Sequence, residues 1–512
     1  MANARVVGPR ARERERATTA IAAALAIMSR SPDRAGRALA GGLYRISRTE
    51  QQRMIAEWVK EYLAPGSPGA AYAARLTRQL HPNVRKRFLA GFIANLFFRD
   101  PQVSERLKKE LGINAPNLLA ISPSMRCNLR CTGCYAGEYD RKDDMPPELF
   151  DRILTEAESI GTRVFILIGG EPFMWPPLLD IISRHRDSQF QIYTNSSMLD
   201  DAMVERIVEL GNIAPAVSIE GGREHTDARR GKGTYDKVIG AMARLRDAGV
   251  MFSYSATATR QNLDDITSDA FVDLMVELGA MYGWYFMYAP VGMDPDLELM
   301  LTPPERDRLR REVQRLRTEK PILLGDFWHD GILTGGCLSA GRKYVHINNK
   351  GDVEPCVFCH FAVDNLHDMS LVDALASDFF RDLRRMQPFG HNLLRPCPLI
   401  DHPGVIRGAV QKHGAYATHP GAESMVTDLQ PGLREYATGV RDVFAPVWEE
   451  EYDWARRWLS SDPEWNRRHD RAMDAEEEMT VERSVVVGEP AEAEPAGWAP
   501  LPDLSEPATE PV

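Results

Sequence analysis

Apolar and polar positions follow two different periods along this chain, and the change of period marks its main regions. From residue 117 onward, short apolar runs alternate with longer amphipathic stretches, which is typical of repeated strand–helix units. The runs predict six strands, at residues 117–121, 164–168, 190–193, 214–219, 251–256 and 284–288. The stretches between them predict helices at residues 147–159, 177–185, 200–210, 235–248 and 268–278. Six such units indicate an α/β fold, a partial (βα)6 barrel, whose active site is built by loops at the carboxyl ends of the parallel strands.

The segment before the barrel has a helical pattern. Helices are predicted at residues 50–63, 72–80 and 84–98, and residues 20–28 form an apolar segment preceded by arginines. In the last helix, apolar residues recur at helical spacing, at Phe88, Leu89, Phe92, Ile93 and Leu96. Packing of this helical region on the barrel is the favoured interpretation. The alternative is an element on an anionic membrane surface, with arginines at the rim of its apolar face.

These patterns divide the chain into five parts. They are an N-terminal helical region at 1–114, the barrel at 115–300, a small cysteine-rich domain at 301–400, a loop with C-terminal helices at 401–471, and an acidic tail at 472–512. The tail holds eleven Asp and Glu residues against one arginine, so it lacks the apolar residues to bury a core and is expected to be disordered. Its balance of −10 accounts for most of the net charge of −11. The nearly neutral remainder gives no support for nucleic-acid binding.

The part after residue 400 carries two further expectations. Residues 401–430 are interpreted as a loop, and its histidines are expected to face solvent rather than bind a metal: His402, His413 and His419. Residues 432–459 have a helical pattern, with three tryptophans as expected packing anchors: Trp448, Trp454 and Trp458. No apolar run in the chain reaches the ~20 residues of a membrane-spanning helix.

The cysteines fall into two groups. Their number, seven, is odd, which argues against a disulfide framework, and thiols kept reduced indicate a cytoplasmic protein. Three of them lie at 127–134, and four lie downstream, at Cys337, Cys356, Cys359 and Cys397. Three and four thiolates are the ligand sets of one open and one closed cubane iron–sulfur cluster.

The first group has the spacing C-x3-C-x2-C, at Cys127, Cys131 and Cys134, directly after the first predicted strand. Such a loop wraps three thiolates around three irons of a cubane cluster, and soft sulfur ligands favour iron–sulfur and zinc sites. The fourth iron is then left for a small molecule to chelate. The alternative is a structural zinc loop, which normally needs four protein ligands.

A Gly169-Gly170-Glu171-Pro172 turn follows the second predicted strand. Two glycines let the backbone approach a ligand closely, and a carboxylate beside exposed carbonyls suits an ammonium group. With the three-cysteine loop one strand earlier, this turn resembles the radical S-adenosylmethionine (SAM) superfamily.

The resemblance implies where SAM binds. Its amino and carboxylate groups would chelate the open iron, and the residues 169–172 would hold the methionine amino group, with Glu171 also assigned to the catalytic site. By position, Asn195, Ser218 and Glu220, at the ends of the third and fourth strands, would contact the SAM ribose and carboxylate. Many members have an aromatic residue just before the third cysteine, whereas here Gly133 stands there and Tyr135, the assigned cofactor contact, follows the cysteine.

Two adjacent arginines stay open to two interpretations. Arg229 and Arg230 precede Gly231 in the loop region after the fourth predicted strand. They could bind a carboxylate or phosphate through two parallel hydrogen bonds, or belong to a solvated loop.

The downstream cysteines have a recognisable order. The arrangement C-x13-G-x4-C, from Cys337 through Gly351 to Cys356, resembles the start of a SPASM or twitch domain, which carries auxiliary iron–sulfur clusters. With Cys359 and Cys397 it implies one auxiliary [4Fe–4S] cluster. A closed zinc site with four thiolates is the alternative, and His360 is a further potential ligand.

The expected function follows from the resemblance. A radical SAM enzyme of this kind cleaves SAM reductively at its [4Fe–4S] cluster, and the 5′-deoxyadenosyl radical abstracts hydrogen from a substrate, here a lipid or a peptide that the motifs do not identify. Its partners would be an electron donor such as flavodoxin or ferredoxin and that substrate, in the cytoplasm or peripherally at the inner membrane face. Two other classes stay open: an iron–sulfur electron-transfer protein without its own catalysis, and a zinc-stapled scaffold.

Overall fold

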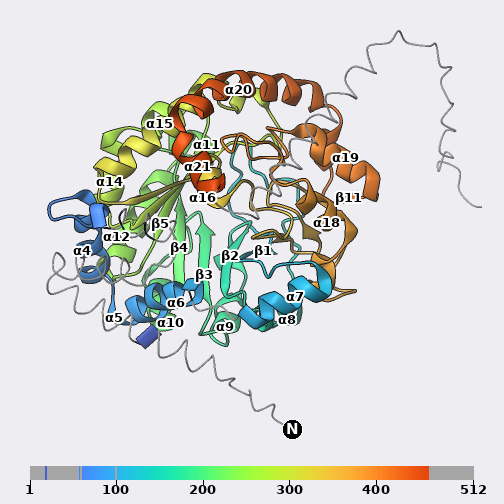
Figure 1. The fold of residues 1–512 in the computed structure, drawn as a ribbon. Helices are drawn as coiled ribbons and strands as arrows, with labels where there is room; N and C mark the ends of the chain where they lie inside the picture. Colours follow the sequence, from blue (N-terminus) through green and yellow to red (C-terminus); the bar gives the residue numbers. More distant parts are fainter. Residues whose placement is uncertain (1–17, 20–52, 54–56, 58–59, 98–100, 461–512) are drawn as a thin grey trace, which may run out of the picture.

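The computed structural model describes residues 18–19, 53, 57, 60–97 and 101–460. The apolar segment at 20–28, most of the helix predicted at 50–63, and the tail at 472–512 lie outside the described residues. Six parallel strands occur where the sequence predicts them: β1 (Leu119–Ser124), β2 (Val164–Gly169), β3 (Gln189–Thr194), β4 (Ile213–Ser218), β5 (Ser253–Ala258) and β6 (Tyr282–Met287). They lie side by side in chain order, and helices cover the outside of the sheet (Figure 1). The α/β fold with a mostly parallel sheet is therefore confirmed.

The predicted helices between the strands are also present: α8 (Pro147–Ser159), α9 (Leu178–Ile182), α10 (Asp201–Leu210), α12 (Thr234–Asp247) and α14 (Asp269–Glu277). Their ends follow local chemistry. The Asp200 side chain caps α10 by accepting the Met203 N–H at 2.8 Å, and Gly211 ends the helix in a left-handed conformation. Ser268 caps α14 in the same way. Shorter helices α11 (Arg223–Arg230) and α13 (Leu263–Ile266) lie in the loops after β4 and β5.

The sheet continues beyond these six strands on both edges. The strand β7 (Leu323–Asp326) pairs parallel to β6, while β8 (His346–Ile347) pairs parallel to β1 and antiparallel to β9 (Val353–Glu354). Residues 301–400, predicted as a small cysteine-rich domain, supply these strands to both edges of the barrel sheet. The remaining elements of this part are η3 (Leu297–Leu299), α15 (Pro303–Glu319), α16 (Gly331–Thr334), β10 (Phe361–Ala362), α17 (Leu371–Leu375) and α18 (Asp378–Arg385).

The segment after residue 400 does not contain the loop predicted at 401–430, but it does contain the helices predicted at 432–459. It forms α19 (Pro403–His413), β11 (Tyr416–Ala417) and η4 (Ala422–Val426), followed by α20 (Gln430–Glu451) and α21 (Asp453–Ser460). Pro403 and two glycines suggest a loop, but proline fits the first turn of a helix, and apolar side chains of α19 are buried. The expectation of solvated histidines is wrong as well, because His402 and His419 are buried and His413 Nε2 lies 2.9 Å from Asp382.

The predicted tryptophan anchors of the C-terminal helices behave differently from one another. Trp448 is buried in a cluster with Phe444 and Tyr452. Trp454 is 45% exposed, so it is not an anchor. The side chain of Trp458 lies outside the described residues.

The N-terminal helices close the end of the sheet where the strands begin (Figure 1). They are α4 (Pro68–Arg78), α5 (Pro82–Val84), the π-helical turn η1 (Arg85–Ala90), α6 (Gly91–Phe97) and α7 (Pro101–Leu111). Val84, Phe88 and Leu89 pack against residues at or just before the starts of β4, β5 and β6. The Arg75 guanidinium donates to three carbonyls, at Val276, Ala280 and Pro321. The apolar face of these N-terminal helices is therefore buried against the barrel, which favours packing on the barrel over the membrane-surface alternative. Within the described residues, no helix combines the length and apolar character that crossing a membrane requires.

Candidate functional site

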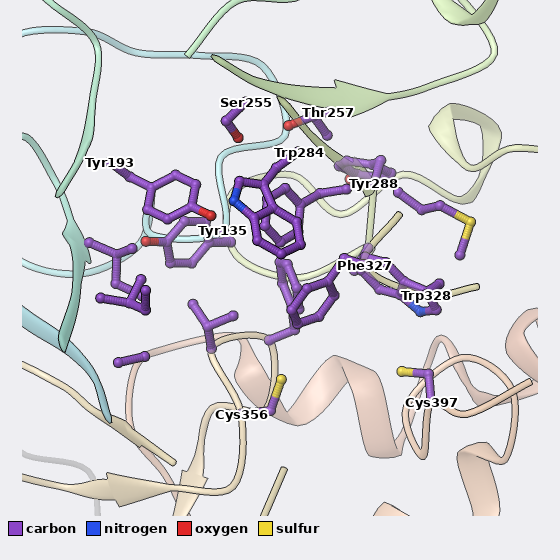
Figure 2. A pocket seen from close by; sticks show the side chains of 18 of the residues that line it. Tyr135, Tyr193, Ser255, Thr257, Trp284, Tyr288, Phe327, Trp328, Cys356 and Cys397 are labelled. Atoms are coloured by element: carbon purple, nitrogen blue, oxygen red, sulfur yellow. The ribbon is translucent and has the colours of Figure 1, made fainter. Parts of the chain in front are cut away.

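A cavity of about 530 Å³ opens among the loops at the carboxyl ends of the strands. Residues of every barrel strand and of the cysteine-rich segment line the cavity, and all seven cysteines are among them. Figure 2 shows aromatic side chains gathered in it, with Cys356 and Cys397 on the far side from β5. The structure therefore brings both predicted cysteine groups to one space.

The three-cysteine loop follows β1, whose register shifts between Ile121 and Ser124 just before the loop begins. Arg141 fastens the loop by donating to the Leu129 carbonyl at 2.7 Å and to the Cys127 carbonyl at 3.3 Å. Gly133 has a φ of 62°, and an added Cβ would lie 2.5 Å from the Tyr288 ring. Only glycine fits there, which explains the absence of an aromatic residue at that position.

Some residues of the turn after β2 line the cavity, and others are buried behind its wall. Gly169 and Gly170 line the cavity, and a Cβ on Gly170 would lie 2.1 Å from the Arg126 carbonyl oxygen. Glu171 is 0% exposed and is not among the lining residues. Its carboxylate accepts hydrogen bonds from the Thr194 hydroxyl at 3.0 Å and from the Asn195 backbone N–H at 2.7 Å.

Glu171 therefore ties the β2 turn to the end of β3. Burial raises its pKa to about 7, although these hydrogen bonds act in the opposite direction. Pro172 is also buried, at the start of the short helix η2 (Pro172–Met174).

Of the SAM contacts predicted at the ends of β3 and β4, some also line the cavity and one is buried behind it. Asn195 and Ser218 line the cavity, together with Tyr135, whose hydroxyl accepts the Gly169 N–H at 3.0 Å. Glu220 lies behind the wall and is 1% exposed. Its Oε1 accepts from Arg229 and Arg230 at 2.5 Å each.

The two arginines do line the cavity, and Glu220 behind the wall compensates one of their two positive charges. Burial alone would raise the pKa of Glu220, and the two guanidinium groups lower it below its ordinary value.

The second cysteine group is held by neighbouring polar contacts. The Tyr344 hydroxyl donates to Cys356 Sγ at 2.7 Å, and Cys337 Sγ lies 3.1 Å from the Ser339 hydroxyl. Burial raises the pKa of the Cys356 thiol to about 12. His360, the further potential ligand, has its Nδ1 2.5 Å from His419 Nε2.

Cys397 depends on a buried ion pair that the sequence does not reveal. Asp401 Oδ2 accepts the Cys397 backbone N–H at 2.9 Å, and Arg306 of α15 donates to Asp401 Oδ1 at 2.5 Å. Both charged side chains are 0% exposed. The partners stand 95 residues apart, so no local pattern could have found the pair.

A second group of buried side chains that the sequence does not reveal joins the two cysteine loops. The Tyr139 hydroxyl, five residues after Cys134, donates to Glu354 Oε1 at 3.0 Å, and Glu354 lies two residues before Cys356. Glu354 also accepts from Thr418 at 2.6 Å and contacts His346 Nδ1 at 2.5 Å. Buried hydrogen bonds therefore join the two cysteine loops.

The chemical type of the donors suits the clusters that the motifs imply, although the described side chains are not drawn together as ligands in this structure. All seven cysteines are free of disulfides, and they are the soft donors that iron–sulfur clusters use. The group Cys127, Cys131 and Cys134 lies beside the open backbone of Gly169 and Gly170, as an open cluster with a bound amino acid requires. Among the residues that the structure describes, no three His, Cys, Asp or Glu side chains are grouped so as to hold a metal ion.

Comparison with known proteins agrees with the fold and the site. Residues 121–269 match the radical SAM superfamily, so the chain contains a radical SAM domain. Residues 337–398 match the SPASM iron–sulfur cluster-binding domain, so it contains that domain as well. These two domains imply a [4Fe–4S] cluster, SAM and auxiliary iron–sulfur binding.

Two curated relatives are similar over more than half of the chain. The AdoMet-dependent heme synthase of Methanosarcina barkeri is 25% identical over 302 residues, which cover 53% of this chain and 85% of that protein. The mycofactocin maturase MftC of Mycolicibacterium smegmatis is 27% identical over 317 residues, covering 57% and 77%.

Among solved structures, SuiB of Streptococcus suis bound to S-adenosylmethionine superimposes with a TM-score of 0.50 at 20% identity. The match covers 64% of this chain and 87% of SuiB. SuiB bound to the precursor peptide SuiA gives the same TM-score over 58% and 74%. At this identity the likeness shows a shared fold.

Proposed function

We propose that this protein is a radical SAM enzyme that cleaves SAM reductively and uses the 5′-deoxyadenosyl radical to abstract hydrogen from a substrate held in the cavity. One observation carries the proposal: the three-cysteine loop, the Gly169–Gly170 backbone and a ring-lined space share one cavity. When bound by Cys127, Cys131 and Cys134, the cluster supplies the electron for SAM cleavage.

The chain's own residues bind and orient the cofactor. The backbone of Gly169 and Gly170 takes the ammonium group, while Asn195 and Ser218 contact the ribose and carboxylate. Glu171 fixes Asn195 through its backbone N–H and so sets the geometry of this contact. The aromatic side chains that line the cavity would exclude water from it, which protects a reactive radical from side reactions.

Cys337, Cys356, Cys359 and Cys397 would hold the auxiliary [4Fe–4S] cluster, which would supply one-electron redox chemistry beside the substrate. A flavodoxin or ferredoxin in the cytoplasm would supply the first electron. Among the similar proteins, one is named a heme synthase, and the SuiB structure contains a precursor peptide. A peptide or a porphyrin is thus supported as substrate by these relatives, beside the lipid that the sequence leaves open.

Anaerobic reconstitution tests the proposal directly. The wild-type protein should bind about eight irons per chain and form 5′-deoxyadenosine from SAM under a strong reductant. Replacing Cys127, Cys131 and Cys134 together by Ala should leave about four irons and no 5′-deoxyadenosine. Cys337→Ala is the matched control, since it should lose auxiliary iron and keep SAM cleavage.

The two other classes give different results in the same experiment. An electron-transfer protein would bind iron without cleaving SAM, and a zinc-stapled scaffold would bind zinc at stoichiometric level without iron. Either outcome in the wild-type protein would refute the enzyme.

A further inference from the structure

The cavity wall is divided by chemistry as well as by strand. One side carries the three-cysteine loop and the predicted SAM contacts, at the ends of β2, β3 and β4. Another side is made of aromatic rings from β3, β6, the segment after β7, and both cysteine loops (Figure 2). This second side, called here the ring wall, consists of Tyr135, Tyr193, Phe286, Phe327, Trp328 and Phe358.

The rings of this wall form one continuous chain of contacts. The centroid of Phe327 lies 4.9 Å from that of Phe286 and 5.3 Å from that of Trp328. Trp328 continues to Phe358 at 5.6 Å. The ends of the chain are Tyr193, 5.9 Å from Phe286, and Tyr135, 6.1 Å from Phe358. Aromatic faces and edges at such spacings favour further rings over chains of equal area.

The charged residues of the cavity wall have partners that lie outside the cavity. Among the described residues that line the cavity, these are two arginines and two aspartates: Arg229, Arg230, Asp326 and Asp330. The arginines share Glu220 behind the wall. Asp326 Oδ2 lies 2.6 Å from His329 Nδ1, and Asp330 pairs with Arg317 at 2.8 Å. His329, Arg317 and Glu220 are not lining residues, so both aspartates have their partners behind the wall. The two arginines share one carboxylate and keep a net positive charge, but they lie at the three-cysteine loop, where the Thr132 N–H donates to the Arg229 carbonyl, and not on the ring wall.

An ionised group that entered the ring side would therefore lose its water without gaining a counter-charge. Burial of a charge without a partner is strongly unfavourable, whereas an uncharged ring loses little and gains ring contacts. A porphyrin with ionised propionates would meet this penalty several times over.

We infer that the part of the substrate that reacts is an uncharged group carrying a flat aromatic or conjugated ring, held against the ring wall. This assignment rests on the proposed function and narrows its substrate class. It favours a neutral aromatic moiety over a polycarboxylate porphyrin, an acidic side chain or a saturated acyl chain.

Two fluorophores that differ by one charge test the inference. N-phenyl-1-naphthylamine is neutral, and 1-anilinonaphthalene-8-sulfonate carries the same rings with a sulfonate. Equilibrium dialysis against the anaerobically reconstituted protein should show the neutral probe bound at least about tenfold more tightly. Decanol and coproporphyrin III should fail to displace it. Equal binding of the two fluorophores, or displacement by either competitor, would overturn the inference.

A pair of variants shows whether the probe binds at the ring wall. Phe327→Leu keeps an apolar side chain but removes the central ring, and should weaken the neutral probe by about threefold to tenfold. Trp454→Leu removes an exposed aromatic ring on α21 and should leave binding unchanged. Iron content and the melting temperature establish that each variant is folded. Unchanged probe binding in folded Phe327→Leu would also refute the inference.

The same samples separate this inference from the proposed function. Absence of 5′-deoxyadenosine with selective binding of the neutral probe would refute the enzyme and leave the binding chemistry standing. Normal SAM cleavage with unselective probe binding would refute the substrate class alone.

Discussion

The buried pair of Arg306 and Asp401 offers the sharpest test of how this site is supported. The guanidinium approaches the carboxylate twice, at 2.5 and 3.2 Å, and donates a further hydrogen bond to the Leu394 carbonyl at 2.9 Å. Burial alone would raise the pKa of Asp401, and Arg306 beside it lowers that pKa below its ordinary value. The carboxylate is therefore charged in the folded protein and depends on its partner.

Arg306→Leu removes one charge and leaves the other buried. Loss of one partner of a buried pair costs about 3–5 kcal/mol of the free energy of unfolding. The carboxylate would then turn toward water and release the Cys397 N–H, so auxiliary iron should fall as well. The double variant Arg306→Leu/Asp401→Leu should lose less stability than the two single changes added together, because no unpaired charge remains.

Arg315→Leu is the matched control on the same helix. Arg315 forms ion pairs with Asp269, Glu312 and Glu319 at the surface, and exposed pairs contribute about 0–1 kcal/mol. Urea unfolding at matched iron content compares the variants, and iron analysis reports on the second cysteine group. If Arg306→Leu destabilised the protein no more than Arg315→Leu, the supporting role of the pair would be refuted.

Three further predictions follow from contacts described above. Glu171→Gln should weaken SAM binding by about 1.5–3 kcal/mol at a pH above the Glu171 pKa of about 7, measured by equilibrium dialysis, because the Asn195 N–H loses a charged acceptor; wild-type affinity would contradict that role. Gly170→Ala should abolish SAM cleavage while most iron is retained, since a Cβ there meets the Arg126 carbonyl; an active variant would disprove the close fit. Burial lowers the pKa of His185, but its hydrogen bonds to Glu158 and Asp151 raise that pKa above 6.5. The stabilisation of the folded protein by charged His185 is therefore full below pH 6.5 and is lost as the pH rises through the raised pKa. The difference in melting temperature between wild type and His185→Asn should therefore shrink from about pH 6 to about pH 9, and a constant difference would speak against the ion pairs.

The strands and helices of the barrel were predictable because each has its own periodic pattern. The predicted helix at 147–159 has the observed bounds of α8, and the six strands begin within three residues of their expected starts. The strands β8 and β9 have two residues each, too few to show any period. Their place at the sheet edge is decided by the pairing of β8 with β1 and of β9 with β8, which a local pattern does not encode.

The site was predictable as far as its motifs reach. Spacing places Cys127, Gly169 and Asn195 at strand ends, and parallel strands bring those ends together. Which side chains face the cavity is decided by tertiary partners. Glu171 and Glu220 have the residue type of ligand-binding carboxylates, yet both point into the protein because hydrogen-bond donors from the neighbouring strand or helix meet them there. Two of these donors, Arg229 and Asn195, are 9 and 24 residues away from their carboxylates in sequence.

Because helices α4, α5 and α6 lie at one end of the barrel and the cavity lies at the other, stability and chemistry depend on different ends of the molecule. These helices cover the ends of the sheet opposite the cavity, so amino-acid changes among them alter the folding free energy without reaching the reactants. In α/β barrels this end carries stability and the other end carries chemistry. Thermal margin gained there, by better helix caps or tighter packing, allows the cavity end to tolerate the destabilising changes that a new reactivity demands. Evolution or directed mutagenesis can thus adjust substrate preference at one end of the molecule and restore robustness at the other.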